Sequence, residues 1–299
     1  MIETTAPATG AFAPTPEELA QWDANGYIVR EGVFSPEECD ALSAAAEQLA
    51  FDESIPQGRR KLNALALERG AEQPVMHSVT RPDIYDARFR AHLRDPRLTD
   101  VLAAILGPDL LTHNNLFLFK APGVGLPFPW HQDMWFFRNS YRTPTTVGAW
   151  QAMDDATIPN GCMWVIPGSH RLPVLEHDLP TDGPQQEEFR RARVPEEEEA
   201  KAIPVEVPRG SVLFFHGFLL HKSGHNHTER PRRTYVTHFL RADAEMVHPD
   251  RKGWPLDWVR GKAHPEVTTQ PEPDDRLADI DRQWWENAAR RQAENAAKM

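Results

Sequence analysis

The chain has 299 residues and a formal net charge of −11, with 40% hydrophobic and 26% charged residues. This composition is typical of a globular protein, and we expect a single domain spanning residues 1–299. A negative charge without clustered Lys and Arg argues against a nucleic-acid or anionic-membrane partner.

Cysteine content and the apolar pattern indicate the compartment. Two cysteines, Cys39 and Cys162, are too few for a disulfide framework or a thiolate zinc site. The first residues lack a basic region followed by an apolar run, so we expect no secretory signal. No stretch reaches the roughly 18 apolar residues of a membrane span. We therefore expect a cytoplasmic protein, either a monomer or a homodimer.

Helices dominate the first third of the predicted structure. Residues 1–15 are rich in Pro and Thr and are expected to form a flexible lead-in. A helix then begins at Pro16 and ends at Gly26, and a strand follows it. A second helix begins after Ser35, which forms a capping box with Glu38 three residues later.

After the second helix, residues 52–80 are charged and are predicted to be irregular, and a further short helix ends at Gly107. Between residues 110 and 242, short runs rich in β-branched and aromatic residues alternate with Pro, Gly and Asn. This pattern predicts an antiparallel sandwich or barrel rather than βαβ units.

Two polar segments follow different patterns. Residues 172–203 form an insertion that contains four consecutive glutamates, Glu196–Glu199. We interpret it as a solvated loop or short helix, with a lid over the site as the alternative. Residues 274–299 are predicted to form a C-terminal helix.

The run PFPWHQDMWFF contains His131 and Asp133. In a strand, residues two apart point to the same side, so these side chains would project together. An imidazole and a carboxylate are two members of the two-His-one-carboxylate set, which binds iron(II) and leaves coordination positions open. His-x-Asp by itself is a weak signal, because it is frequent by chance.

The third ligand could come from the later segment GSVLFFHGFLLHKSGHNHTERPRRTYVTHF. This segment contains five candidate histidines: His216, His221, His225, His227 and His238. Spacing alone does not choose between them. His216 and His238 lie in apolar runs, as hydrogen-bonded core histidines do, whereas His225 and His227 lie in a polar turn. His221 ends an apolar run just before that turn, a favourable place for a ligand at a barrel mouth.

Taken together, these motifs resemble the phytanoyl-CoA dioxygenase family of iron(II)- and 2-oxoglutarate-dependent oxygenases. The likeness extends from WDANGYIVREGVFSPEECDAL to RRTYVTHF, and it is most specific in WHQDMWFF, AWQAMDDATIPNGCMWVIPGSHR and LLHKSGHNHTERPRR. It implies a mainly β fold with flanking helices, a double-stranded β-helix of the cupin-like jelly-roll type.

The resemblance also implies a set of site residues. His131, Asp133 and His221 would be the iron(II) ligands. Arg232, eleven residues after His221, would hold the distal carboxylate of 2-oxoglutarate. Arg233 would face outward because side chains alternate along a strand.

Further residues of the co-substrate site are implied by the same resemblance. Ser223 matches a second hydrogen-bonding partner of the 2-oxoglutarate carboxylate, and Trp150 matches a tryptophan that lines its pocket. Asn115 aligns loosely with an amide near the co-substrate, and an ordinary strand residue is an equally good interpretation.

The activity implied is oxidation of a small molecule, a metabolite or natural product of secondary metabolism, with iron(II), 2-oxoglutarate and dioxygen. We expect hydroxylation of an unactivated C–H bond with release of succinate and carbon dioxide. Desaturation, epoxidation and ring formation use the same ligands and remain alternatives, as does a non-catalytic cupin-like metal-binding protein. Halogenation is disfavoured because Asp133 supplies the carboxylate that halogenating relatives lack.

Aromatic residues beside the predicted metal site suggest an apolar or ring-containing substrate. Trp130, Trp135 and Phe137 are the candidates for the substrate pocket. Because alternate strand residues face opposite ways, some of these aromatic side chains are expected to pack into the barrel instead.

Overall fold

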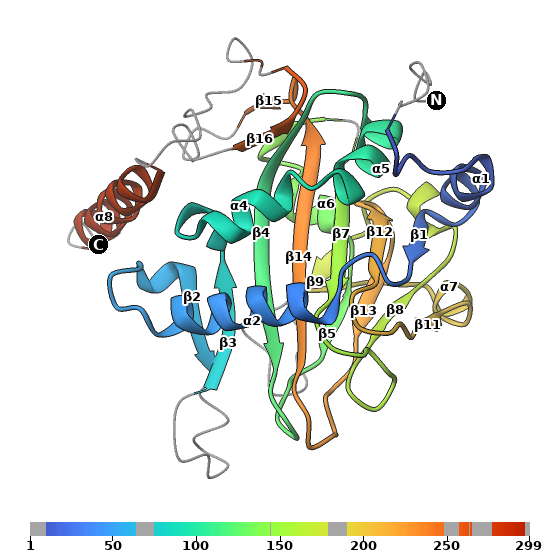
Figure 1. Ribbon diagram of the computed structural model, residues 1–299, viewed down its shortest axis with the longest axis horizontal. Helices are drawn as coiled ribbons and strands as arrows, with labels where there is room; N and C mark the ends of the chain where they lie inside the picture. Colours follow the sequence, from blue (N-terminus) through green and yellow to red (C-terminus); the bar gives the residue numbers. More distant parts are fainter. Residues whose placement is uncertain are drawn as a thin grey trace.

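The computed structural model describes residues 10–63, 75–143, 145–178, 190–247, 257–262, 264 and 277–296. Two antiparallel sheets pack against each other, and helices cover the outer face of the larger sheet (Figure 1). This arrangement confirms the double-stranded β-helix with flanking helices that the sequence predicted.

The larger sheet has eight strands. Its order is β1 (Tyr27–Arg30), β12 (Val212–His216), β7 (Val147–Ala152), β14 (Arg232–Arg241), β4 (Leu110–Lys120), β3 (Val75–Thr80) and β2 (Arg60–Asn63), with β16 (Asp257–Arg260) also pairing with β4. The smaller sheet has the order β11 (Ile203–Val205), β8 (Met163–Val165), β13 (His221–Ser223) and β5 (Phe128–His131). Two short pairs complete the described strands: β9 (His177–Asp178) with β10 (Arg191–Ala192), and β6 (Tyr141–Arg142) with β15 (Glu245–Met246).

The described helices are mostly short. They are α1 (Pro16–Asn25), α2 (Pro36–Phe51), α4 (Ala87–Leu93), α5 (Pro96–Leu106), α6 (Asp133–Phe137), α7 (Glu196–Glu199) and α8 (Leu277–Ala296), with single 3-10 turns η1 (Gln57–Arg59), η2 (Pro82–Ile84) and η3 (Ser169–Arg171). α2, α4 and α5 pack on the larger sheet. α8 corresponds to most of the C-terminal helix predicted for residues 274–299. None of the described helices is both long and apolar enough to cross a membrane.

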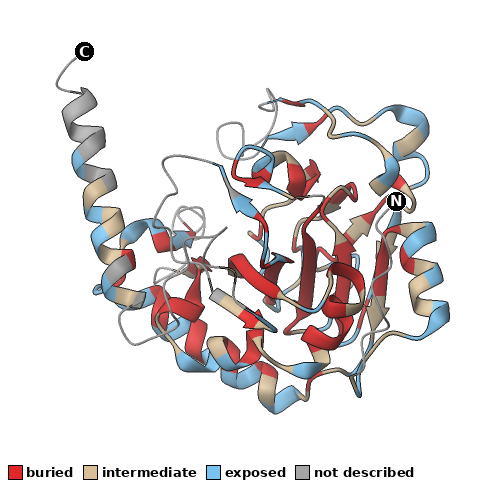
Figure 2. Cartoon of the chain, turned by 90° about the horizontal axis from the view of Figure 1, so that it is seen from above, coloured by how far each residue is buried: buried red, intermediate tan, exposed pale blue. Residues whose placement is uncertain are grey.

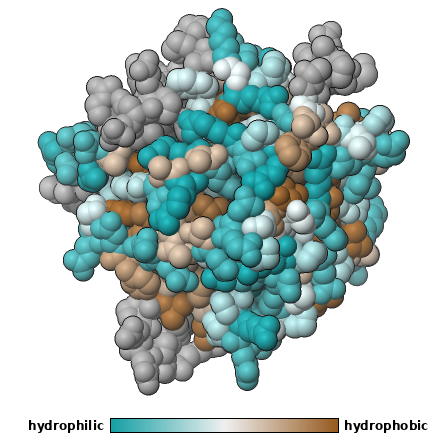
Figure 3. Space-filling view, viewed as in Figure 1, coloured by the Kyte–Doolittle hydropathy of each residue, from teal (hydrophilic) through white to brown (hydrophobic). Residues whose placement is uncertain are grey.

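Successive side chains along the strands point to opposite faces of the larger sheet and so form two separate cores. On β12, Phe214 packs toward the helices, whereas the next residue, Phe215, packs between the two sheets. Tyr235 and Val236 divide in the same way on β14. Figure 2 shows the central strands as mostly buried and the outer faces of the helices as exposed. The surface seen in Figure 3 is mainly hydrophilic, with small hydrophobic areas between hydrophilic ones.

The first two helices begin as the sequence predicted. Thr15 and Glu18 form a capping box at α1, and Ser35 and Glu38 form one at α2. Gly26 ends α1 in the left-handed conformation, with φ 81°, which glycine adopts without a steric penalty. These boundaries depend only on local hydrogen bonds, and so they can be read from sequence.

Two features of the N-terminal half differ from the prediction. The described part of residues 52–80 is not irregular, because it contains β2 and β3. β3 pairs with β4, a partner distant in sequence that local patterns do not reveal. Within the expected lead-in, residues 10–15 contact the body: the Phe12 backbone N–H donates to Asp100 at 3.1 Å, and the Arg30 guanidinium donates to the Phe12 carbonyl at 2.7 Å.

Candidate active site

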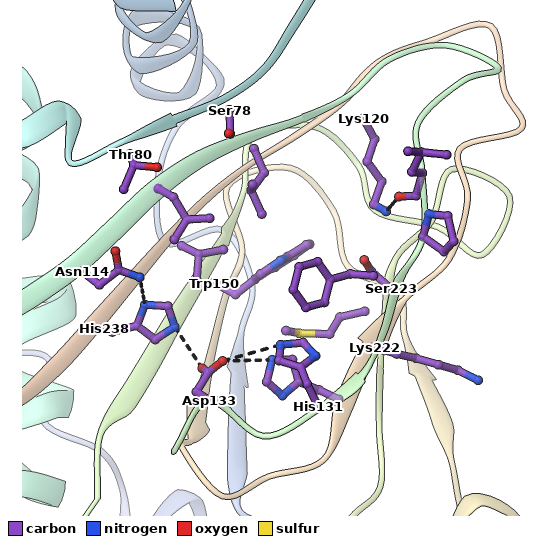
Figure 4. A pocket seen from close by; sticks show the side chains of 18 of the residues that line it. Ser78, Thr80, Asn114, Lys120, His131, Asp133, Trp150, Lys222, Ser223 and His238 are labelled. Atoms are coloured by element: carbon purple, nitrogen blue, oxygen red, sulfur yellow. Dashed lines mark hydrogen bonds and ion pairs between the residues drawn. The ribbon is translucent and has the colours of Figure 1, made fainter. Parts of the chain in front are cut away.

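Three buried side chains converge where β5 meets β13. His131 ends β5, Asp133 opens α6, and His221 opens β13. His131 and His221 are directly opposite in the strand pair, with ring centroids 3.9 Å apart. One possible ligand atom from each of the three groups lies within 4.8 Å of the others. Figure 4 shows this convergence around Asp133.

Each ligand imidazole has a defined orientation. Nδ1 of His131 is 2.9 Å from the carbonyl oxygen of Pro129, and Nδ1 of His221 is 2.9 Å from that of Leu219. Because a carbonyl oxygen only accepts, each Nδ1 carries the hydrogen and each Nε2 keeps its lone pair. Both Nε2 atoms face Oδ1 of Asp133, at 3.6 and 3.7 Å. This N,N,O donor set fits iron(II).

Burial sets the protonation states of these groups. It lowers the pKa of His131 to about 3, and the neighbouring His221 acts in the same direction. Burial also lowers the pKa of His221. Burial acts to raise the pKa of Asp133, but the imidazoles of His238 and His221 outweigh it and hold that pKa below its ordinary value. Neutral imidazoles and an ionised carboxylate are the forms that bind a divalent metal.

The ligand-bearing segment is not one continuous strand, contrary to the prediction. β5 ends at His131, and Asp133 is already in α6. The fully buried Gln132 holds the turn between them, since its amide donates to the carbonyl oxygens of Pro173 and Phe218 at 3.2 and 2.9 Å. Tertiary contacts, rather than strand alternation, therefore aim the two ligands at one point.

The structure distinguishes the five candidate histidines. Within the described residues, only His221 belongs to a group of three potential metal ligands with His131 and Asp133. His216 instead accepts a hydrogen bond from a backbone N–H two residues later, at 3.2 Å. His225 and His227 lie in the loop after β13, with their rings 5.4 Å apart.

A cavity of about 420 Å³ opens beside the three side chains. Its polar lining includes Ser78, Thr80, Asn114, Lys120, Ser223, Arg232 and His238. Its apolar lining includes Leu116, Leu118, Phe128, Phe136, Phe137, Trp150, Phe215 and Val236. The predicted residues Arg232, Ser223 and Trp150 therefore share this cavity with the three potential ligands, as Figure 4 shows for Ser223 and Trp150.

Two buried basic side chains from paired positions of β14 and β4 line the cavity. Arg232 is 1% exposed and donates to the Thr234 hydroxyl at 2.6 Å and the Gly161 carbonyl at 2.9 Å, both neutral groups. Lys120, opposite Arg232 in the strand pair, donates to the carbonyl oxygens of Leu126 and Gly224. Burial lowers the pKa of Arg232 to about 10, and burial together with Arg232 holds the pKa of Lys120 well below its usual value.

Asn115 lies on the opposite face of β4 from the cavity. Its amide donates to Asp83 at 2.8 Å, and its carbonyl accepts a hydrogen bond from the Tyr235 hydroxyl at 2.9 Å. The neighbouring residue Asn114 lines the cavity instead. The side chain available to the cavity is therefore one position earlier than the resemblance implied.

The predicted aromatic residues also divide. Phe137 lines the cavity, but Trp130 and Trp135 are not among its described lining residues. Trp130 donates to Glu199 at 2.8 Å on the other side of β5, and Trp135 stacks on His177 at 4.8 Å. β5 alternation turns Trp130 away from its neighbour His131.

Two polar residues of the site were not identified from sequence as functional. Lys120 is the last residue of β4, where no motif distinguished it from other strand residues. His238 was one of the five candidate ligands, in an apolar run typical of a core histidine, and no other role was predicted for it; it contacts Asp133 at 2.9 Å. Parity with a predicted site residue was the available signal for His238.

Comparison with known proteins agrees with this geometry. The family model described as phytanoyl-CoA dioxygenase (PhyH) matches residues 22–234. A curated relative, phytanoyl-CoA dioxygenase domain-containing protein 1 of Danio rerio, is 24% identical over 278 residues, covering 79% of this chain and 93% of its own.

Solved structures show the same fold. The apo form of EctD from S. alaskensis aligns with a TM-score of 0.65 and 21% identity, covering 89% of this chain and 92% of its own. The epimerase SnoN, solved with Fe³⁺, alpha ketoglutarate and nogalamycin RO, aligns with a TM-score of 0.61 and 24% identity, covering 77% and 84%. The chain thus belongs to the phytanoyl-CoA dioxygenase family of iron- and 2-oxoglutarate-dependent oxygenases.

Proposed function

We propose that this oxygenase hydroxylates an unactivated C–H bond of a small-molecule metabolite or natural product and releases succinate and carbon dioxide. The observation that carries the proposal is the buried donor set of His131, Asp133 and His221, which borders a cavity lined by the buried basic residues Lys120 and Arg232. Iron(II), 2-oxoglutarate and dioxygen would together supply the oxidising power for the C–H bond.

The cationic end of the cavity suits the distal carboxylate of 2-oxoglutarate. Arg232 donates to neutral groups in the described part of the chain, and its buried Nε has no hydrogen-bond partner there. A buried guanidinium is stabilised when a carboxylate pairs with it. Lys120 would add a second N–H donor, and Ser223, two residues after His221, would add a hydroxyl. Trp150, 5.6 Å from the Arg232 guanidinium carbon, would enclose that end.

The remaining cavity wall indicates the chemistry of the substrate. Phe128, Phe136 and Phe137 contribute apolar surface to the cavity. Ser78 and Thr80 on β3 supply hydroxyl groups to it (Figure 4). We propose a substrate with an apolar or ring-bearing part against the phenylalanines and a hydrogen-bonding edge against β3. Enclosure by these side chains would also keep water from the reacting C–H bond.

Succinate release tests the proposed function. Candidate small molecules are screened with the iron-loaded chain, and those that stimulate succinate formation are analysed for a hydroxylated product. Replacing His131, Asp133 or His221 singly with Ala should abolish the stimulated succinate formation, because each change removes a metal ligand. His216→Ala is the matched control and should retain it. Wild-type succinate formation by His221→Ala would contradict the ligand assignment.

A further inference from the structure

His238 contacts a ligand carboxylate without belonging to the ligand group. Its Nε2 lies 2.9 Å from Oδ2 of Asp133, while Oδ1 of the same carboxylate faces the Nε2 atoms of His131 and His221 (Figure 4). The two carboxylate oxygens thus have different partners. Because an ionised carboxylate only accepts hydrogen bonds, Nε2 of His238 carries the hydrogen.

The second ring nitrogen of His238 supports this tautomer. With the hydrogen on Nε2, Nδ1 is an acceptor, and it lies 3.4 Å from the amide nitrogen of Asn114. This contact requires no charge on the imidazole, because the Asn114 amide N–H donates to Nδ1. The hydrogen bonds therefore run in one direction, from Asn114 through His238 to Asp133.

The position of His238 is well defined by packing. It is 5% exposed, and the rings of Phe137 and His113 lie 5.2 and 6.1 Å from its ring. It also lies six residues after Arg232 on β14, and both side chains reach the cavity. One strand therefore presents the cation proposed for the co-substrate and the donor to the ligand carboxylate.

We propose that His238 is a positioning residue, which leaves a single oxygen of Asp133, Oδ1, available to the metal. This inference rests on the proposed iron site. A carboxylate can bind a metal through one oxygen or two, and the second oxygen would take a position that this ligand set leaves open for co-substrates. The hydrogen bond from His238 engages Oδ2 and so opposes binding of the metal through both carboxylate oxygens. Without the donor, a buried carboxylate oxygen would also be left unsatisfied.

Metal affinity tests the inference without depending on turnover. Mn(II) is titrated into the metal-free wild-type chain and its variants by calorimetry. His238→Leu should raise the Mn(II) Kd by about 10- to 100-fold, the usual effect of losing a hydrogen bond to a metal ligand. His238→Gln should restore most of the affinity, because its amide N–H can replace the donor. His113→Leu, which removes a neighbouring buried imidazole that does not contact Asp133, is the control and should bind as the wild type does.

The outcomes separate the two proposals. If the wild-type chain does not bind Mn(II), the proposed metal site and this inference both fail. If the wild type binds and His238→Leu binds equally tightly, the metal site stands and the role of His238 is wrong. Equal weakening in His238→Gln and His238→Leu overturns the role of the donor. Should His238→Leu not fold, Asn114→Leu replaces it, and an unchanged Kd in that variant overturns the inference.

Discussion

Arg232 and Arg233 are adjacent in sequence but have opposite environments, because side chains alternate along β14. Arg232 lines the cavity and is 1% exposed. The Arg233 guanidinium donates two hydrogen bonds to Asp154, at 2.9 and 2.6 Å, and Arg233 is not among the described lining residues of the cavity. The parity expected from sequence is therefore present in the structure, and it makes the pair a matched test.

Arg232→Ala should raise the KM for 2-oxoglutarate with little change in folding. Loss of a buried, charge-assisted pair with the co-substrate costs about 2–3 kcal/mol, or roughly 30- to 150-fold in KM. Arg233→Ala should leave this KM near the wild-type value, because its partner Asp154 belongs to the protein. The measurement is succinate formation at varied 2-oxoglutarate. Similar increases in both variants would show that the proposed role of Arg232 is mistaken.

At the scale of elements, the contacts of α8 with the body include a buried ion pair. Asp281 of α8 is 0% exposed and binds the guanidinium of Arg59, which is 1% exposed. The Tyr85 hydroxyl donates to the same carboxylate at 2.6 Å, and Arg59 lies 5.5 Å from the ring of Trp285. Since Arg59 precedes β2 directly, α8 supports the edge of the sheet that carries part of the cavity wall.

Asp281→Ala should destabilise the protein by about 3–5 kcal/mol, because it removes the buried carboxylate that pairs with the Arg59 guanidinium and accepts the hydrogen bond from the Tyr85 hydroxyl. The free energy of unfolding is measured by urea denaturation at neutral pH. Arg193→Ala is the control: its ion pairs with Glu176 and Asp178 are exposed, and such pairs contribute about 0–1 kcal/mol. A loss below about 1 kcal/mol in Asp281→Ala would contradict this account of α8.

In its described parts, the polar insertion of residues 172–203 packs against β5 and the turn that follows it. Glu199 of α7 accepts a hydrogen bond from Trp130, and the Leu175 backbone N–H donates to the Gln132 side chain at 2.8 Å. None of its described residues is among those that line the cavity. The four glutamates form a short exposed helix, one of the two interpretations that the charge run allowed.

At the scale of the whole molecule, the fold also buries a neutral histidine that is not among the described lining residues of the cavity. His92 of α4 is 9% exposed and packs against the rings of Phe34 and Tyr235, at 4.6 and 5.6 Å. Burial lowers the pKa of His92 to about 4. In the unfolded chain this imidazole has its ordinary pKa, about 6.5, so acid favours unfolding.

The pH dependence of stability follows from the sign of this shift. A histidine with a lowered folded-state pKa contributes stability above pH 6.5, and that stability is lost as the pH falls toward 4. Between pH 7.5 and 4.5, His92 alone should account for a decrease of about 2–3 kcal/mol in the free energy of unfolding. Urea denaturation of the metal-free protein at both pH values measures it. His92→Phe should show a smaller decrease, and an equal decrease would contradict the assignment to His92.

Local chemistry determined much of this protein from sequence. The capping box at Ser35 and the alternation that separates Arg232 from Arg233 depend on residues within a few positions of one another. The pattern of His131, Asp133 and a later histidine likewise predicted the side chains that the structure brings together. The first two inferences need only a repeat length or a short hydrogen bond, whereas the ligand set was implied by the resemblance to a known family.

Tertiary structure decided the remainder. The pairing of β5 with β13 places His221 against His131, and no spacing rule distinguished it from the other histidines. The register of β4 directs Asn114 rather than Asn115 into the cavity, and the approach of α6 to β14 brings Asp133 to His238. These outcomes depend on contacts between segments that are distant in sequence. Asp133 and His238, for example, are 105 residues apart. A one-residue difference in register reverses the face of a side chain, so packing between the sheets decides them.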